Sequence, residues 1–240
     1  MLQDLREAVC EANRELPAGG LVTLTWGNVS GFDADASLLV IKPSGVPYGK
    51  LTPASMVVVD LDGGVVEGDL RPSSDTPTHA RLYRFFAGRC PGRIAGITHT
   101  HSASATAFAQ ARTPVPCLGT THADHFHGPV PLARPLTADE VDDGYEAATG
   151  EAIVERFADL DPVATPAVLL AGHAPFTWGA TPAASVENAV ALEAVAAVAL
   201  ATLRLRPDAP PLERHVLDKH HDRKHGAGAY YGQPASPSPS

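Results

Sequence analysis

Cysteine is scarce in this sequence, whose 240 residues hold three, Cys10, Cys90 and Cys117. They share no close spacing and leave an odd count, so the sequence predicts no disulfide framework. The first residues also lack a basic segment followed by an apolar one, which is the pattern of a secretory signal peptide. Both absences favour a protein of the reducing cytoplasm.

An excess of positive charge and long apolar runs are lacking as well. The net charge of −9 argues against a broad nucleic-acid surface, although a small local anion site is compatible with it. The longest apolar run, Ala189 to Leu203, contains Glu193 and is too short to span a membrane, so a buried helix is expected there. No GxGxxG or P-loop pattern occurs, so a nucleotide is not indicated.

The composition, 44% hydrophobic and 19% charged, is that of an ordinary globular protein. Helix and strand patterns follow one another without a repeat or a composition break, which favours one α/β domain over residues 1–233. Residues 234–240 are rich in Pro and Ser and are expected to be disordered. The expected helices are 2–16, 77–89, 102–110, 137–158, 181–206 and 212–224; the expected strands are 21–26, 37–42, 56–61, 65–66, 94–97, 115–118, 130–133, 168–171 and 176–178.

A His-x-His pair, His99 and His101, follows the apolar run at 94–97. Side chains two residues apart in an extended segment share a face, and neutral imidazole is a common ligand of divalent transition metals. Taken alone, the pair is better explained as a solvated strand end. His173 in a turn and Asp75 ahead of a helix would complete a set of three nitrogens and one oxygen suited to zinc. Asp75 alone would be interpreted as a helix N-cap, and spacing does not prove that the four residues meet.

A second histidine cluster is a rival metal site. His122, Asp124, His125 and His127 lie within six residues, but no further carboxylate or Cys stands at a recognisable ligand spacing. His79 lies four residues after Asp75 on an expected helix, where packing or hydrogen bonding is the simpler role.

Three turns carry small hydroxyl or amide side chains, two of them beside glycine and the third ahead of an expected helix. Glycine permits close backbone approach, hydroxyls and amides donate hydrogen bonds, and a helix N-terminus adds partial positive charge, which together suit a phosphate. Each turn taken singly is better explained as an ordinary turn. The candidate residues, including the one cation, are Gly27, Asn28, Lys42, Ser44, Gly45, Ser73 and Ser74.

Short motifs run in one order along residues 21–233. They are TWGNVS (25–30), IKPSGV (41–46), KLTP (50–53), MVVV (56–59), PSSDTPTH (72–79), THTHS (98–102), GTTHAD (119–124), GHAPF (172–176), KHGA (224–227) and AYYGQ (229–233). With these motifs the chain resembles the class II aldolase/epimerase family, and within it the L-ribulose-5-phosphate 4-epimerases.

The resemblance implies a three-layer α/β/α fold around a central, mainly antiparallel sheet. It implies zinc, or another divalent metal such as Mn²⁺, and a sugar-phosphate substrate bound at the three turns. Family members form homotetramers with the active site between subunits, and neither nucleic acid nor a membrane is an expected partner. The implied metal ligands are Asp75, His99, His101 and His173, and the implied acid/base residues are Asp124 and Tyr231 with His220 as a helper.

The implied reaction interconverts L-ribulose 5-phosphate and D-xylulose 5-phosphate by retro-aldol cleavage and re-addition at C3–C4. Asp75 favours it, because related aldolases place a catalytic Glu at that position. The alternatives are a sugar-phosphate aldolase of the L-fuculose-phosphate type and, in another class, a non-catalytic metal-binding oligomer. The chain departs from its relatives at His125 and His127, where they have aromatic residues, at Ala174 in place of Gly, and at Gly228 in place of Lys.

Overall fold

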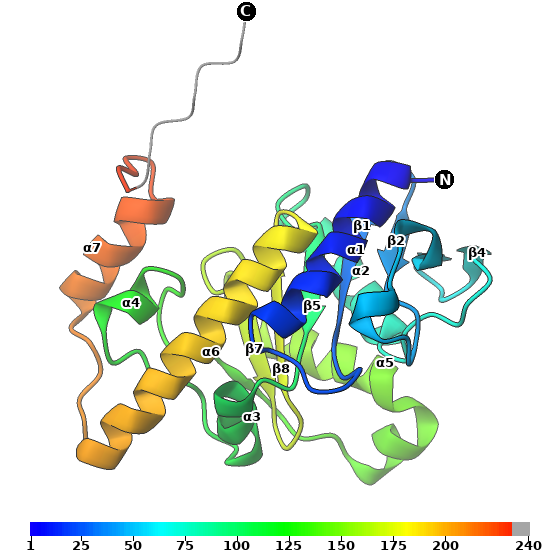
Figure 1. The fold of residues 1–240 in the computed structure, drawn as a ribbon. Coiled ribbons are helices and arrows are strands. Elements are labelled where there is room, and N and C mark those ends of the chain that lie inside the picture. The colour runs from blue at the N-terminus through cyan, green and yellow to red at the C-terminus, as the bar shows by residue number, and fades with distance from the viewer. Residues whose placement is uncertain (232–240) are drawn as a thin grey trace, which may run out of the picture.

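An eight-stranded sheet forms the centre of the molecule in the computed structural model, which describes residues 1–231 (Figure 1). The strands are β1 (Asn28–Asp33), β2 (Leu38–Ile41), β3 (Val57–Asp60), β4 (Val65–Glu67), β5 (Gly96–His99), β6 (Leu132–Ala133), β7 (Ala167–Leu170) and β8 (Pro175–Gly179). The helices are α1 (Gln3–Ala18), α2 (Thr76–Arg89), α3 (Ala103–Gln110), α4 (Thr120–Ala123), α5 (Ala138–Arg156), α6 (Pro182–Leu205) and α7 (Arg214–His225), with 3₁₀ turns η1 (Tyr48–Lys50) and η2 (Pro53–Ser55).

The strand order is β4-β3-β2-β1-β5-β8-β7-β6, and every pair is antiparallel except β6 with β7. Each of the adjacent pairs β1–β2, β2–β3 and β3–β4 joins strands that follow one another in the chain, as is common for antiparallel strands. The central pairs β1–β5 and β5–β8 join distant segments. They bring residue 28 beside residue 99, and residue 99 beside residue 176.

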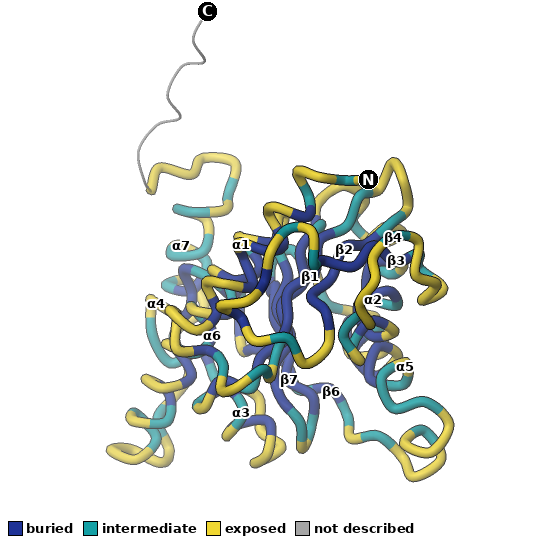
Figure 2. Tube along the Cα trace, turned by 45° about the vertical axis from the view of Figure 1, so that its right-hand side comes forward, coloured by how far each residue is buried: buried dark blue, intermediate teal, exposed yellow. Residues whose placement is uncertain are grey.

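Alternation along β2 and β3 divides the apolar side chains between two helical layers. Leu39 and Val57 belong to the core under α2 and α5, whereas the neighbouring Val40 and Val58 pack toward α1. A strand buried on both faces is apolar throughout, which explains the run from Val57 to Val59. The α/β prediction of three layers around a mainly antiparallel sheet is therefore confirmed, and Figure 2 shows the sheet as the buried centre.

The predicted strand at 21–26 is wrong. This stretch is a loop, Leu24 turns it with a φ of 54°, and the strand begins at Asn28. Asn28, predicted to lie in a turn, instead begins a strand, because residues 28–31 are paired with β5 and residues 30–33 with β2. Gly31 suits this strand since a Cβ there would lie 2.6 Å from the Leu5 side chain. Tertiary packing overrides the local turn preference.

Of two further expectations, the strand at 115–118 is wrong and the capping box at 137–140 is confirmed. Residues 115–118 form no strand but a single bridge from Val115 to Val130, and the short helix α4 follows. At the start of α5, Thr137 and Glu140 make the predicted capping box.

Helix α6 is long and apolar enough to meet a length and composition test for a membrane span, the one such helix in residues 1–231. One side of it packs into the protein core, with Val186, Leu192 and Ala196 buried there, as expected for a buried helix.

The prediction of one domain over residues 1–233 remains a prediction. Residues 232–240, including the predicted disordered tail at 234–240, lie outside the described residues.

Candidate metal and substrate site

Three histidine rings meet where the central strands end. His99 is the last residue of β5, His101 follows two residues later, and His173 lies in the turn between β7 and β8. The ring centroids are 5.0 Å apart for His99–His101, 5.1 Å for His99–His173 and 4.9 Å for His101–His173. One ring nitrogen of each lies within 4.8 Å of the other two, and within residues 1–231 this is the one such group of His, Cys, Asp or Glu.

The hydrogen bonds around His99 leave its Nε2 free to bind a metal. Its Nδ1 lies 2.9 Å from the carbonyl of Pro175, and since a carbonyl only accepts, Nδ1 carries the proton. The Nε2 atoms of His99 and His173 are 3.3 Å apart. Two nitrogens bound at about 2.0–2.1 Å to a tetrahedral zinc would be about 3.4 Å apart, so the spacing fits a shared ion.

The electrostatics of the group favour a divalent cation. Burial, reinforced by the neighbouring histidines, lowers the pKa of both His101 and His173 to about 4. Both rings are therefore neutral near pH 7, which is the form that binds a metal. Three imidazole nitrogens are a donor set typical of zinc and related transition metals.

Asp75 lies in the same pocket but outside the tight histidine group. It occupies the N-cap position of α2, yet its carboxylate makes no capping bond and instead accepts from Asn28 Nδ2 at 2.6 Å. Burial alone would raise the pKa of Asp75, but nearby His99 and His79 and the Asn28 bond together hold the pKa below its ordinary value. The N-cap interpretation of this side chain is wrong, and an ionised carboxylate faces the histidines.

One cavity of about 600 Å³ brings together all the metal and substrate residues predicted from the sequence. The loop before β1, the end of β2, the entrance to α2 and the ends of β5 and β7 converge on it. The predicted residues that line it are Gly27, Asn28, Lys42, Ser44, Gly45, Ser73, Ser74, Asp75, His99, His101 and His173.

Two side chains in this cavity have unused capacity to bind a ligand. Lys42 is 2% exposed, its Nζ donates only to the Pro43 carbonyl, and it forms no ion pair in the described part of the chain. Burial lowers the pKa of Lys42. The Oδ1 of Asn28 is buried without a partner. A phosphate would pair with the lysine, and a hydroxyl group would satisfy Asn28, so the pocket suits a polyhydroxylated anion.

Four residues lining the same cavity were not predicted. Thr25 and the half-exposed Trp26 border the histidine side, where the Trp26 ring centroid is 6.4 Å from that of His101. Tyr145 and Glu146 reach it from α5. The sequence held one weak signal for the last two, a glycine at position 144 inside an expected helix, which often marks a kink.

The predicted acid/base residues form a separate cluster beside α7. Asp124 Oδ1 accepts from His220 Nδ1 at 3.1 Å, and its carboxylate accepts two bonds from Arg223. The Tyr231 ring lies 5.1 Å from the Arg223 guanidinium and 4.5 Å from Lys224 Nζ. Burial alone would raise the pKa of Asp124, but the Arg223 and His220 bonds hold it below its ordinary value.

This cluster lies far from the metal group of the same chain. Helix α2 begins beside the cavity at Asp75, and 14 helical residues extend about 21 Å. Its far end, Arg89, lines another cavity together with His221 and His225. His225 Nε2 in turn donates to the Asp124 carbonyl at 2.9 Å. Asp124 therefore belongs to the opposite end of α2 from the histidines.

The rival histidine cluster does not assemble as a metal site in the described residues. His127 Nε2 bonds Asp218 at 2.7 Å and its ring packs on His221, so it ties the Asp124 loop to α7. His122 Nε2 donates to the Gly128 carbonyl, and burial lowers the pKa of this histidine to about 4. His79 is fully buried and bonds Ser30 Oγ at 2.7 Å, as expected for a packed residue.

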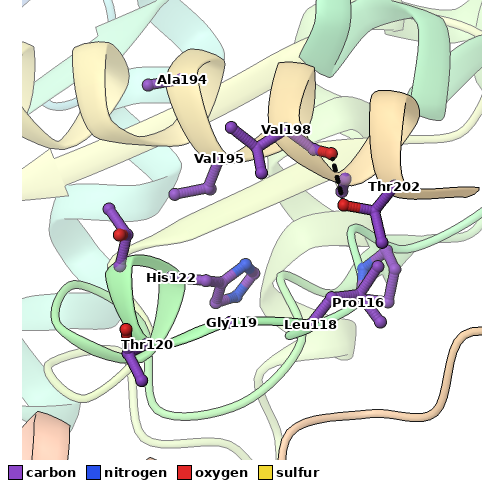
Figure 3. Close-up of a pocket in the computed structure, with 11 residues that line it drawn as sticks. Pro116, Leu118, Gly119, Thr120, His122, Ala194, Val195, Val198 and Thr202 are labelled. Carbon is purple, nitrogen blue, oxygen red and sulfur yellow. Dashed lines mark hydrogen bonds between the residues drawn. The ribbon is translucent and has the colours of Figure 1, made fainter.

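A cavity of about 290 Å³ between α4 and α6 is a different kind of space (Figure 3). Its lining is mostly apolar, with Val195 and Val198 on one wall and His122 on the other. His122 is its one ionisable side chain and is already bonded to Gly128. This cavity carries none of the residues predicted to bind the substrate or to transfer protons.

Comparison with known proteins places these features in context. The family model described as Class II Aldolase and Adducin N-terminal domain matches residues 7–200. A solved structure named L-fuculose 1-phosphate aldolase is 24% identical, covers 92% of this chain and 95% of its own, and has a TM-score of 0.75.

Two further solved structures are similar over most of their length. YgbL from Klebsiella pneumoniae, whose description leaves aldolase, epimerase and decarboxylase open, is 25% identical with a TM-score of 0.71, covering 91% of this chain and 98% of its own. L-fuculose-1-phosphate aldolase from Thermus thermophilus is 26% identical with a TM-score of 0.63, covering 87% of this chain and 98% of its own.

Proposed function

The chain belongs to the class II aldolase and adducin family, and from this premise we propose that it is a divalent-metal-dependent 4-epimerase of a pentulose 5-phosphate. The substrates we assign are L-ribulose 5-phosphate and D-xylulose 5-phosphate. The observation that carries the proposal is the single cavity that gathers the histidines, Asp75 and the three turns predicted to bind phosphate.

The metal ligands we propose are His99, His101, His173 and Asp75. A divalent ion held by them would supply a Lewis acid for the carbonyl and hydroxyl oxygens at C2 and C3. Zinc suits three imidazoles and one carboxylate best, and Mn²⁺ is an alternative.

The substrate's own structure dictates the route. The hydrogen on C4 is not next to the C2 carbonyl, so simple deprotonation cannot invert C4. Breaking the C3–C4 bond allows C4 to be inverted. One base takes the C4 hydroxyl proton, and C4 becomes the aldehyde carbon of glycolaldehyde phosphate. The electron pair of the broken bond passes to the C2–C3 unit. Turning the aldehyde over, re-forming the bond and returning the proton to the C4 oxygen gives the epimer.

The turn residues hold the phosphate while the aldehyde rotates. Lys42 supplies the charge, and Ser44, Gly45, Ser73 and Ser74 supply hydrogen bonds around it. An anchored phosphate keeps the aldehyde from leaving, and this separates an epimerase from an aldolase.

Two proton-transferring groups on opposite faces of the aldehyde are needed, and we assign these roles to Asp124 and Tyr231, with His220 as a helper. Because the length of α2 separates Asp75 from the Asp124 cluster, we infer that Asp124 and Tyr231 act on substrate bound at the histidines of a second copy of the chain. A homotetramer with sites between subunits meets this need, because a head-to-tail contact that closes on itself repeats the same shared site.

A class II aldolase is the second candidate, favoured by the similarity to the L-fuculose-1-phosphate aldolase from Thermus thermophilus. Asp75 favours the epimerase, since related aldolases use a longer Glu there as a catalytic group. The Asn28 bond to the Asp75 carboxylate also fits a fixed ligand better than a mobile base.

Product analysis separates these candidates. The protein is incubated with L-ribulose 5-phosphate in the presence of an aldehyde-trapping hydrazine. We expect D-xylulose 5-phosphate with little trapped aldehyde. Stoichiometric trapped glycolaldehyde phosphate would indicate an aldolase, and unchanged substrate would favour a non-catalytic metal-binding protein.

We propose the cytoplasm as the compartment of this protein, in keeping with the three free cysteines.

A further inference from the structure

The hydroxyl of Tyr145 lies 3.2 Å from Nδ1 of His173. Tyr145 comes from α5 and lines the same cavity as the histidines, and its ring centroid is 5.9 Å from that of the His173 ring. It is therefore the one tyrosine hydroxyl bonded to the histidine group in residues 1–231.

The shape of α5 places this side chain. Gly144 interrupts the helix with a φ of 156° and a ψ of 74°, a conformation that glycine adopts readily and side-chain-bearing residues rarely do. After the kink, Thr78 Oγ1 donates to the Glu146 carbonyl at 2.5 Å, which fixes this part of α5 to the first turn of α2. Close packing continues at Gly150, where a Cβ would lie 2.8 Å from the Arg81 side chain. The Tyr145 hydroxyl is thus held by the fold.

The Nδ1 atoms of His99 and His173 bond to different kinds of partner, a carbonyl and a hydroxyl. The Pro175 carbonyl can only accept, so it fixes His99 in one tautomer with a lone pair on Nε2. A hydroxyl both donates and accepts, so Tyr145 is compatible with either tautomer of His173.

This difference matters because the Nε2 atoms of His99 and His173 lie only 3.3 Å apart. Without an ion, two lone pairs at that distance would repel, so His173 must carry its proton on Nε2 and accept from Tyr145 at Nδ1. With an ion, Nε2 must present a lone pair, the proton moves to Nδ1, and the Tyr145 oxygen accepts it. The same hydroxyl thus pairs with Nδ1 in both states, and its bond counts for more with the ion present, because there it fixes the metal-binding tautomer and raises the basicity of the ligating nitrogen.

We propose that Tyr145 is a positioning residue of the metal centre, whose hydroxyl orients His173 and stabilises its metal-binding tautomer. The inference rests on the proposed metal-dependent function. It deepens that function by assigning a residue that acts through His173 and need not touch the substrate. Outer partners of metal-bound histidines typically change metal affinity about 10- to 100-fold when removed.

The test is Tyr145→Phe, which keeps the ring against His173 and removes only the hydroxyl. Zinc affinity is measured for the full chain by competition with a chromophoric chelator. We expect affinity about 10- to 100-fold weaker than in the unmodified protein, and activity that returns to normal at saturating zinc. Tyr230→Phe removes the hydroxyl of a tyrosine residue that is 63% exposed and is the matched control, expected to leave affinity unchanged.

Thermal melting of the metal-free proteins separates positioning from folding. The Tyr145→Phe protein should melt within a few degrees of the unmodified protein in the absence of metal, so that a lower affinity reports the lost bond. Unchanged zinc affinity in Tyr145→Phe overturns this inference alone. Failure of the unmodified protein to bind zinc or another divalent ion overturns the proposed function instead.

Discussion

The carboxylate of Asp124 is held by two nitrogens of one guanidinium, accepting from Arg223 Nε at 2.9 Å and from Arg223 Nη2 at 2.5 Å. This bidentate pair keeps the carboxylate ionised and fixes it on the surface of α7. It also fixes Asp124 at the far end of α2 from His99. The proposed reaction therefore needs two copies of the chain for each site.

Mixing two inactive variants tests that arrangement. His99→Ala removes the metal centre and Asp124→Asn removes the acid/base group, so each protein alone should lose at least about 100-fold in epimerase rate. After subunit exchange, about one interface in four joins an intact metal centre to an intact Asp124, so about a quarter of the activity should return.

The control is a double variant carrying both changes in one chain, mixed with His99→Ala. No interface in that mixture has both intact parts, so it should stay inactive. Absence of recovery in the first mixture, once exchange of subunits has been verified, would place the acid/base group in the same chain as its metal centre.

Metal content distinguishes the two histidine clusters. His99→Ala removes one of three converging nitrogens and should reduce zinc from about one ion per chain to well below that. His127→Ala removes a histidine that bonds Asp218 and should leave the zinc content unchanged. Elemental analysis of the dialysed proteins gives both values. The assignment of the metal site is wrong if His99→Ala keeps its zinc and His127→Ala loses it.

Stability of the metal-free protein should fall in mild acid. Burial lowers the pKa of His79 to about 3 and of His122 to about 4, so in the folded state both stay neutral below the ordinary histidine value of about 6.5. Between these values the unfolded chain binds more protons than the folded one, and stability therefore decreases as pH falls from about 6.5 toward 4. The buried His122 alone should contribute a loss on the order of 2 kcal/mol at pH 5. Urea unfolding at pH 7 and pH 5 measures the loss, and equal midpoints would contradict it.

The residues that line the shared cavity could be predicted because each lies in a short motif whose chemistry is local. His99 and His101 share a strand end, and Ser73 and Ser74 precede a helix. The sequence did not reveal Tyr145 or Arg223. Their roles depend on contacts 28 and 99 residues away along the chain, with His173 and Asp124, which no local pattern encodes.

The misplaced first strand has a similar origin. Residues 21–26 have apolar side chains typical of a strand, but β1 forms at 28–33, where both neighbouring strands supply hydrogen bonds. Ser30 pairs with Ile41 on one side, and Asn28 pairs with His99 on the other. These pairing partners decided the location, and the second of them lies too far along the chain for a local pattern to reveal it.

Two glycines offer a matched test of the packing between the sheet and α6. At Gly96 on β5 a Cβ would lie 2.2 Å from the Thr181 carbonyl oxygen, so Gly96→Ala should cost about 2 kcal/mol or more. At Gly88 on α2 a Cβ meets nothing within 4 Å, so Gly88→Ala should stabilise the protein by about 0.5 kcal/mol. Denaturant unfolding gives both values. Equal effects would contradict the close approach of α6 to β5.

The most direct measurement is the interconversion of L-ribulose 5-phosphate and D-xylulose 5-phosphate by the protein before chelation, after chelation, and after zinc is returned. We predict epimerisation that is lost with the chelator and restored by about one equivalent of zinc per chain. A protein that leaves both ketopentose phosphates unchanged in all three states, or that epimerises them equally well after complete removal of metal, would contradict the account.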